Sequence, residues 1–234
     1  MGTSRAFPPL HKARGAWSCG YPYGGFTLLE LLVVIVVIGI LATLLFPGLT
    51  AARVAVGKAR TRIQFNEWAA AVEGFRREYG YYPVLDGSGL VNPPSQATDP
   101  GLPHLFHDVL AARRRDGSAL PAADGTADAL SAEAQNRKSI AFHAFAPTDF
   151  TTDQSTGPNL LCDACANTEI AVLVDRNLDG VVQMGSDFAT LPYVGGIIPG
   201  LADFPAAGIR AGVIFYAPAP GATVRNPGFI FSWK

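Results

Sequence analysis

The chain has 234 residues, enough for one globular domain plus an extra segment, and its net charge of -1 is close to balanced. Such a balance gives no electrostatic reason to expect a nucleic-acid partner. Apolar residues make up 49% of the chain and charged residues only 16%, and much of that bias lies in one segment near the N-terminus.

Residues 1–25 precede that segment and have a different character. They are rich in glycine, proline and aromatic residues and show neither a helical nor a strand period. Their charged residues are Arg5, Lys12 and Arg14, with no acid among them. We interpret residues 1–25 as a leader or tail rather than as a domain.

Residues 26–46 form an apolar run, FTLLELLVVIVVIGILATLLF, whose only charge is Glu30. At about 1.5 Å per residue, a helix of this length spans roughly 30 Å, the thickness of the bilayer core. The run is too long for the apolar part of a secretory signal, and no cleavage site of small residues follows it. It predicts a retained transmembrane helix.

The next segment, residues 47–80, predicts an amphipathic continuation, so that one long helix covers residues 27–79. Pro47 can kink or interrupt this helix where the second part begins. Gly80 suits the position directly after the last helical residue. One face of the second part carries large apolar residues at three- and four-residue spacing, namely Phe65, Trp68, Val72, Phe75 and Tyr79.

The remaining chain predicts a C-terminal head. Residues 81–160 form an irregular region rich in proline and glycine, with short helix candidates at 102–115 and 127–145, and residues 161–234 are β-rich. The strand candidates are Glu169–Val174, Val181–Met184, Gly212–Ala217 and Gly228–Trp233. The whole predicts an α+β fold in which a long N-terminal helix packs on a head with a small antiparallel sheet.

The segment from Gly24 to Glu30, GGFTLLE, resembles the cleavage and methylation signature of the type IV pilin and type II secretion pseudopilin superfamily. The resemblance implies that prepilin peptidase cuts between Gly25 and Phe26 and methylates the new N-terminal Phe26. Glu30 would become the fifth residue of the mature chain. Pro47 would become the twenty-second, where many members of the family also have proline.

This resemblance implies a structural subunit of a type IV pilus-like filament or of a secretion pseudopilus. Such a subunit crosses the inner membrane once, with its head outside the cytoplasm, and joins other pilin-like subunits on an inner-membrane assembly platform. The alternative is a membrane-anchored, extracytoplasmic calcium- or ligand-binding protein that does not polymerise. The sequence contains no P-loop, GxGxxG, HExxH or nucleophile-elbow motif, so no pattern in it predicts an enzyme.

Glu30 needs a physical explanation, because a carboxylate inside a bilayer is costly and such residues usually have a function. A free amino terminus at Phe26 would supply a positive partner, and in a filament that terminus can belong to a neighbouring subunit. The other interpretation is a glutamate tolerated near the membrane edge. Pro47 also has two interpretations, a point where the helix loosens in the fibre or a plain kink at the membrane exit.

A second chemical motif follows the first strand candidate of the β-rich segment. Alternating oxygen ligands followed by a glycine match the first half of an EF-hand-type calcium loop. The candidate ligands are Asp175, Asn177, Asp179, Val181 and Gln183. The second half departs from the pattern, since the twelfth position is Ser186 and Asp187 comes one residue late. A polar β-hairpin turn is the competing interpretation; calcium-stabilised heads among the pseudopilins that the chain resembles keep the calcium interpretation open.

Cys162 and Cys165 form a CxxC pair. Thioredoxin-like chemistry would need a βαβ context, which does not surround them, and a zinc site would need a second pair of ligands. A disulfide closing a short loop is the favoured interpretation. So small a loop would fix local geometry more than it would stabilise the whole fold.

Overall fold

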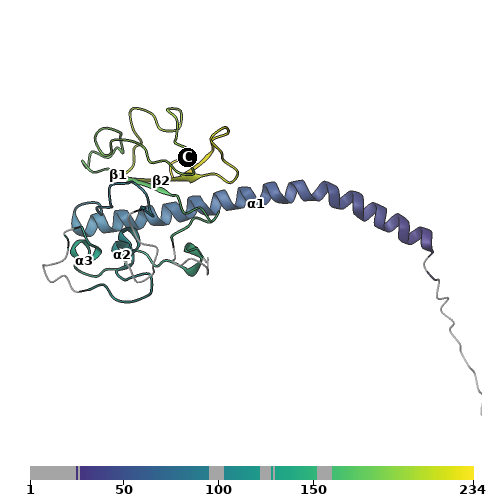
Figure 1. Cartoon of the computed structure of the whole chain (residues 1–234), viewed down its shortest axis with the longest axis horizontal. Helices are drawn as coiled ribbons and strands as arrows, with labels where there is room; N and C mark the ends of the chain where they lie inside the picture. The colour runs from purple at the N-terminus through teal and green to yellow at the C-terminus, as the bar shows by residue number, and fades with distance from the viewer. Residues whose placement is uncertain (1–24, 26, 95–102, 122–127, 129, 152–159) are drawn as a thin grey trace, which may run out of the picture. The chain divides into compact units, whose positions relative to one another are not determined.

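The computed structural model describes residues 25, 27–94, 103–121, 128, 130–151 and 160–234, without the side chains of residues 44–48 (Figure 1). The chain divides into two compact units, Met1–Gly48 and Leu49–Lys234. The elements are the helices α1 (Leu28–Tyr79), α2 (Leu105–Ala111) and α3 (Ala132–Gln135), the 3-10 helix η1 (Pro147–Asp149), and the strands β1 (Ala171–Val174), β2 (Val213–Pro218) and β3 (Phe229–Phe231).

The second part of α1, from Leu49 to Tyr79, supplies the centre of the larger unit. The predicted apolar face is confirmed, because Phe65, Trp68, Val72 and Phe75 are all fully buried, and Tyr79 packs partly buried against the same core. The helix ends where the sequence predicts. Gly80 has a φ of +82°, a conformation that glycine adopts without strain, and its N–H donates to the carbonyl of Arg76 at 2.7 Å.

The three strands form one antiparallel sheet in the order β1-β2-β3. Ala171 pairs with Tyr216, and Tyr216 pairs with Phe231. Alternate residues of the strands point to opposite faces. Val172 and Phe215 join α1 in the main core, whereas Tyr216 and its neighbours pack into a second apolar cluster under the loops of residues 182–211. The sheet is therefore buried on both faces.

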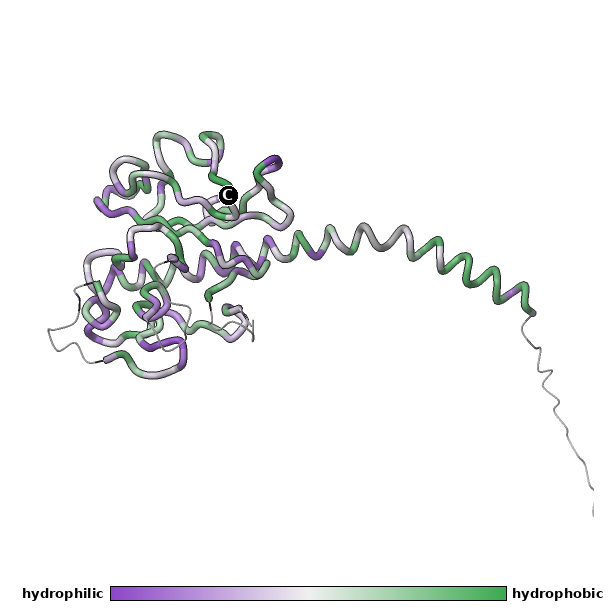
Figure 2. Tube along the Cα trace, viewed as in Figure 1, coloured by the Kyte–Doolittle hydropathy of each residue, from purple (hydrophilic) through white to green (hydrophobic). Residues whose placement is uncertain are grey.

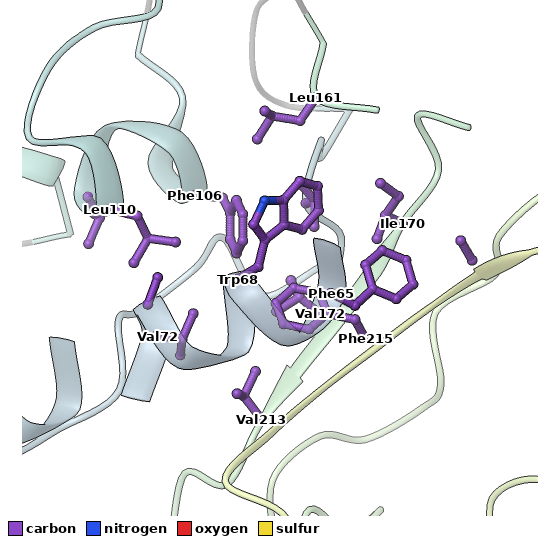
Figure 3. Packing of buried hydrophobic residues seen from close by; sticks show 14 of the residues in the cluster. Phe65, Trp68, Val72, Phe106, Leu110, Leu161, Ile170, Val172, Val213 and Phe215 are labelled. Carbon is purple, nitrogen blue, oxygen red and sulfur yellow. The ribbon is translucent and has the colours of Figure 1, made fainter. Parts of the chain in front are cut away.

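Trp68 joins the two sides of the head. In Figure 1 the sheet lies on one side of the second part of α1, and α2 and α3 lie on the other. Figure 3 shows the Trp68 ring between these layers. Its ring centroid lies 5.5 Å from that of Phe106 in α2 and 5.9 Å from that of Phe215 in β2. The Trp68 indole thus contacts both layers, and Phe106 and Phe215 also contact each other directly, with ring centroids 5.9 Å apart.

The short helices differ from the prediction. Instead of 102–115, α2 covers Leu105–Ala111, since Ala112 takes a left-handed conformation with a φ of 55°. The candidate at 127–145 is reduced to α3. The side chain of Asn136 ends it by donating to the carbonyl of Val109 and by accepting from the N–H of Ile140. These side-chain bonds replace the next turn of helix.

The predicted strand at Val181–Met184 is also wrong. Only isolated bridges occur there, between Val182 and Ile209 and between Met184 and Phe188. The reason is local: the carboxylate of Asp187 accepts the backbone N–H of Gln183 at 2.8 Å. A side chain thereby takes a donor that a continuous ladder would need.

A buried polar network fixes the start of α2. His104 is fully buried, and its Nδ1 accepts the N–H of His107 at 3.2 Å, so His104 caps the helix. Its Nε2 lies 3.0 Å from Oδ1 of Asn92. Because Nδ1 accepts, the neutral ring carries its proton on Nε2 and donates it to Asn92. The cap therefore requires the neutral form of His104.

Burial, with a further contribution from Arg115, lowers the pKa of His104 to about 3 from an ordinary value of 6.5. The unfolded chain then binds a proton that the folded chain does not, so stability falls as the pH drops below about 6.5. We expect His104→Asn, which keeps a capping acceptor but does not titrate, to lose less of its pH 7 unfolding free energy by pH 4 than the unchanged protein. Denaturant unfolding at both pH values measures this, and equal losses would contradict it.

Gly212 allows the start of β2 to approach α1 closely. A Cβ at this position would lie 1.8 Å from the hydroxyl of Tyr82 and 2.0 Å from Oε1 of Glu73. These two groups are bonded to each other, since the Tyr82 hydroxyl donates to Glu73 at 2.7 Å. A side chain here would have to separate them.

We expect Gly212→Ala to lower the unfolding free energy by about 1–3 kcal/mol, as overpacking of a filled site does. Gly200→Ala is the matched control, because nothing lies within 4 Å of its Cβ position and the change should stay within about 0.5 kcal/mol. Thermal or denaturant unfolding of the two variants gives the comparison. An equal loss of unfolding free energy in the two variants would contradict the close approach of Gly212 to Tyr82 and Glu73.

Candidate processing and assembly site

The predicted processing junction lies just before α1. Gly25 is exposed and non-helical, and nothing lies within 4 Å of its Cβ position. Phe26, the other half of the junction, lies outside the described residues. Helix α1 begins two residues later, at Leu28. The residue before the predicted cut is therefore accessible, as a site of proteolysis must be.

The first turn of α1 is closed by a reciprocal pair of side chains. Oε2 of Glu30 accepts the backbone N–H and the hydroxyl of Thr27, each at 2.9 Å. The hydroxyl oxygen of Thr27 accepts the N–H of Glu30 at 3.2 Å. This is a capping box, in which each side chain satisfies a backbone donor that the helix start leaves unpaired.

The capping box gives Glu30 a function inside its own chain. The N–H that its carboxylate accepts belongs to Thr27, the residue directly after Phe26. A cut before Phe26 would create an ammonium group one residue away from that N–H. Thr27 was not among the residues predicted from the sequence, although its spacing to Glu30 is the T-x-x-E signature of a capping box ahead of an apolar run.

The first part of α1, which precedes Leu49, is mostly apolar along its described length, as the green of the tube in Figure 2 shows, and Glu30 is its charged residue. Its large apolar side chains from Leu28 to Leu41 are 48–88% exposed in the single chain. A helix of this kind requires an apolar environment around it. Within the part of the chain whose side chains are described, no helix is long and apolar enough to cross a bilayer. Phe26 and residues 44–48, Pro47 among them, lie outside that part.

Comparison with known proteins bears directly on this segment. Residues 22–46 match the family model of the prokaryotic N-terminal methylation motif. The chain carries a prepilin-type methylation motif. The matched residues include Gly25, Phe26 and Glu30, and the match is consistent with the type IV pilin and pseudopilin family. Searches among curated proteins and among solved structures found no match.

The motif has consequences for the whole chain. It indicates a structural protein rather than an enzyme, made as a prepilin and suited to a membrane anchor. It implies processing by prepilin peptidase and assembly with pilin-like subunits. Because the match ends at residue 46, the chemistry of the head has to be derived from its own residues.

The candidate calcium loop is held together by its own hydrogen bonds. Asp175 is fully buried, and its two oxygens accept the N–H groups of Asp179 and Gly180 at 3.2 and 2.7 Å. Asp179 accepts the N–H of Val181 at 2.8 Å and the side-chain amide of Asn177 at 2.9 Å. Four of the predicted ligands thus lie in one closed turn.

Asp187 is the second buried carboxylate of this loop, and it lies at its far end. Its Oδ1 accepts the N–H of Arg176 at 2.8 Å, and its Oδ2 accepts the N–H of Gln183 at the same distance. The side-chain amide of Gln183, a predicted ligand, donates to the carbonyl of Ala206. Among the described residues, no three His, Cys, Asp or Glu side chains are placed together as a metal site.

The two cysteines of the CxxC pair are unbonded in the structure. The Cys162 thiol lies 3.9 Å from the carbonyl oxygen of Thr148. The Cys165 sulfur instead accepts from the hydroxyl of Thr61 in α1 at 3.7 Å. Burial raises the pKa of the Cys162 thiol to about 11 and also raises that of Cys165. The predicted disulfide stays a prediction, and as thiols the two residues are weak nucleophiles at neutral pH.

Proposed function

We propose that this chain is a structural subunit of a type IV pilus-like filament or of a type II secretion pseudopilus. The observation that carries this proposal is the match of residues 22–46 to the methylation motif. Prepilin peptidase cuts between Gly25 and Phe26 and methylates Phe26. The mature chain then waits in the inner membrane, with its head outside the cytoplasm, until the assembly platform adds it to a filament of pilin-like subunits.

The first part of α1 performs both the anchoring and the assembly. In the membrane, lipid covers the apolar side chains between Leu28 and Leu41. In the filament, the equivalent helices of other subunits cover them. Pro47, at the end of this part, loosens the helix so that it fits the fibre. The exchange leaves the apolar surface covered in both states.

Glu30 changes its partner during this process. Among the described residues of the uncut chain, it accepts from the backbone and the hydroxyl of Thr27. After the cut, the ammonium group of Phe26 from a neighbouring subunit becomes available, and pairing with it neutralises both charges as the helix leaves the lipid. The capping box holds the carboxylate at the helix start, where a staggered neighbour reaches it.

We expect Glu30→Ala to leave membrane insertion intact and to reduce filament output by tenfold or more, because the Phe26 ammonium of a neighbour then enters the fibre unpaired. Glu30→Gln, which keeps a capping acceptor, is the control that separates the charge from the cap. Filament yield by electron microscopy and immunoblot, relative to membrane-bound subunit, measures the effect. Glu30→Gln, which lacks the charge, should be impaired like Glu30→Ala. Normal output from Glu30→Gln would contradict the role of the charge.

A separate proposal concerns calcium. The alternating oxygens of Asp175, Asn177 and Asp179 have the chemistry that Ca²⁺ prefers, with Val181 and Gln183 as further ligands. Every described carboxylate oxygen of the loop already accepts a hydrogen bond, so an ion would share these oxygens with N–H donors. Its charge would offset that of the fully buried Asp175 and so stabilise the loop.

If the loop binds calcium, its removal with EGTA should lower the melting temperature of the purified chain by a few degrees, as the loss of a ligand specific for the folded state does. Asp179→Ala should abolish the shift. Asp203→Ala, which removes a surface carboxylate paired with Lys234, should keep it. A melting temperature that EGTA leaves unchanged would reject calcium.

A further inference from the structure

The face of α1 that points away from the core carries a regular stripe of small and apolar residues. We call this stripe the outer seam, and its members are Leu49, Ala52, Val56, Ala59, Ile63, Asn66 and Ala70. All of them are exposed. The three large ones, Leu49, Val56 and Ile63, are 50, 51 and 59% exposed.

The spacing of the outer seam alternates between three and four residues and repeats every seven. This is the heptad period of helices that pack side by side. The core residues Phe65 and Val72 each follow a seam residue by two positions, which turns them about 200° around the helix. From Thr61 onwards the second part of α1 is therefore apolar on two opposite faces, and its own head buries only one of them. Residues 49–56 are exposed on all sides.

Several features of the outer seam favour a helix as its partner. Large residues at Leu49, Val56 and Ile63 alternate with Ala52 and Ala59, and alanine lets two helix backbones approach closely. Asn66 is the single polar residue of the seam, and a polar side chain there pairs best with its own equivalent in the other helix. The period favours another helix with the same repeat over a flat or irregular partner surface.

The charges beside the outer seam identify the partner as a second copy of this chain. Arg62 borders the seam on one side and Glu67 on the other, five residues later. In a parallel pair of helices in register, these flanking positions meet across the seam, so that Arg62 and Glu67 form two equivalent ion pairs. Both residues are exposed, and in the described part of the chain neither belongs to an ion pair.

The same charges discriminate against a shifted pairing. If one helix moved by one heptad, Arg62 of one copy would meet Arg60 of the other, and like charges at these positions repel each other. A groove of about 820 Å³ runs beside the seam, and Arg60, Ile63, Gln64 and Glu67 line one of its walls. It leaves room for the side chain of Arg62 from a second copy next to Glu67.

We propose that two copies of this chain pair in parallel and in register through their outer seams, from Leu49 to Ala70, with Arg62 of each copy paired to Glu67 of the other. The pairing involves only residues after Gly48 and needs no cleavage at Gly25. It is therefore independent of the filament role, and the two can be tested separately.

Disulfide crosslinking of the full chain in membranes tests the pairing, with Cys19, Cys162 and Cys165 replaced by serine. We expect Val56→Cys and Ile63→Cys to give disulfide-linked dimers on mild oxidation, because in-register helices place equal positions within reach of a disulfide. Val54→Cys is the matched control, since Val54 is 38% exposed on the opposite face of the same turn. Equal crosslinking of Val54→Cys, or none at Val56→Cys, would overturn the proposal.

Two further measurements address register and charge. When the Val56→Cys and Ile63→Cys chains are produced together, each should link to its own kind; a majority of mixed dimers would overturn the in-register pairing. Arg62→Glu or Glu67→Arg alone should lower the Val56→Cys crosslink roughly two- to tenfold, as the loss of two exposed ion pairs predicts, and the double exchange should restore it. Single exchanges without effect would overturn the ion pair.

Filament yield is scored in the same cells. Dimers linked at Val56→Cys in cells that make no filament would support the pairing and reject the filament role. Filaments without such dimers would support the filament role and overturn the pairing.

Discussion

The apolar surface of the first part of α1 is the constraint on which the account depends. From Leu28 to Leu41 every large apolar side chain is about half exposed or more in the single chain, and water is an unfavourable environment for a helix of this kind. Lipid or an apolar protein surface, such as other helices, has to cover it. A chain with this segment therefore needs an apolar environment around it, and the methylation motif matches residues 22–46, which lie directly before and within the segment. The proposed filament role supplies lipid first and neighbouring helices afterwards.

The second part of the same helix has a different role, which is to support the head. Trp68 and its neighbours fix the helix in the head by contacts on both sides, with Phe106 in α2 and Phe215 in β2. A helix buried in this way is a rigid support, because its residues are held by packing rather than by propensity. The outer seam lies on the opposite face of the helix, which the head leaves exposed. One helix can therefore support the head and contact a second copy.

The sequence predicts best those structural features whose cause lies within one short segment of the chain. The face from Phe65 to Phe75 and the helix end at Gly80 follow from spacing and from glycine chemistry within one segment, and both are confirmed. The capping box of Thr27 was equally local and could have been found from its T-x-x-E pattern. The processing motif was recognised from seven residues, and the family comparison supports it.

The features that sequence analysis missed rest on contacts between distant segments. Helix α3 is short because Asn136 bonds to Val109 in another helix. His104 caps α2 while its other nitrogen meets Asn92, twelve residues earlier, outside any regular element. Neither partner can be assigned from spacing, since Asn and His are compatible with many loop positions. In the same way, the spacing of the CxxC pair can be read from the sequence. The contact of Cys165 with Thr61 in α1 cannot.

The central claim is that the chain is made to be cut before Phe26, and the mass of the mature protein tests it most directly. Intact-mass spectrometry of the chain, purified from the membranes of a host with active prepilin peptidase, should show a protein that begins at Phe26 and carries one added methyl group. A chain that keeps residues 1–25 in that host would contradict the account.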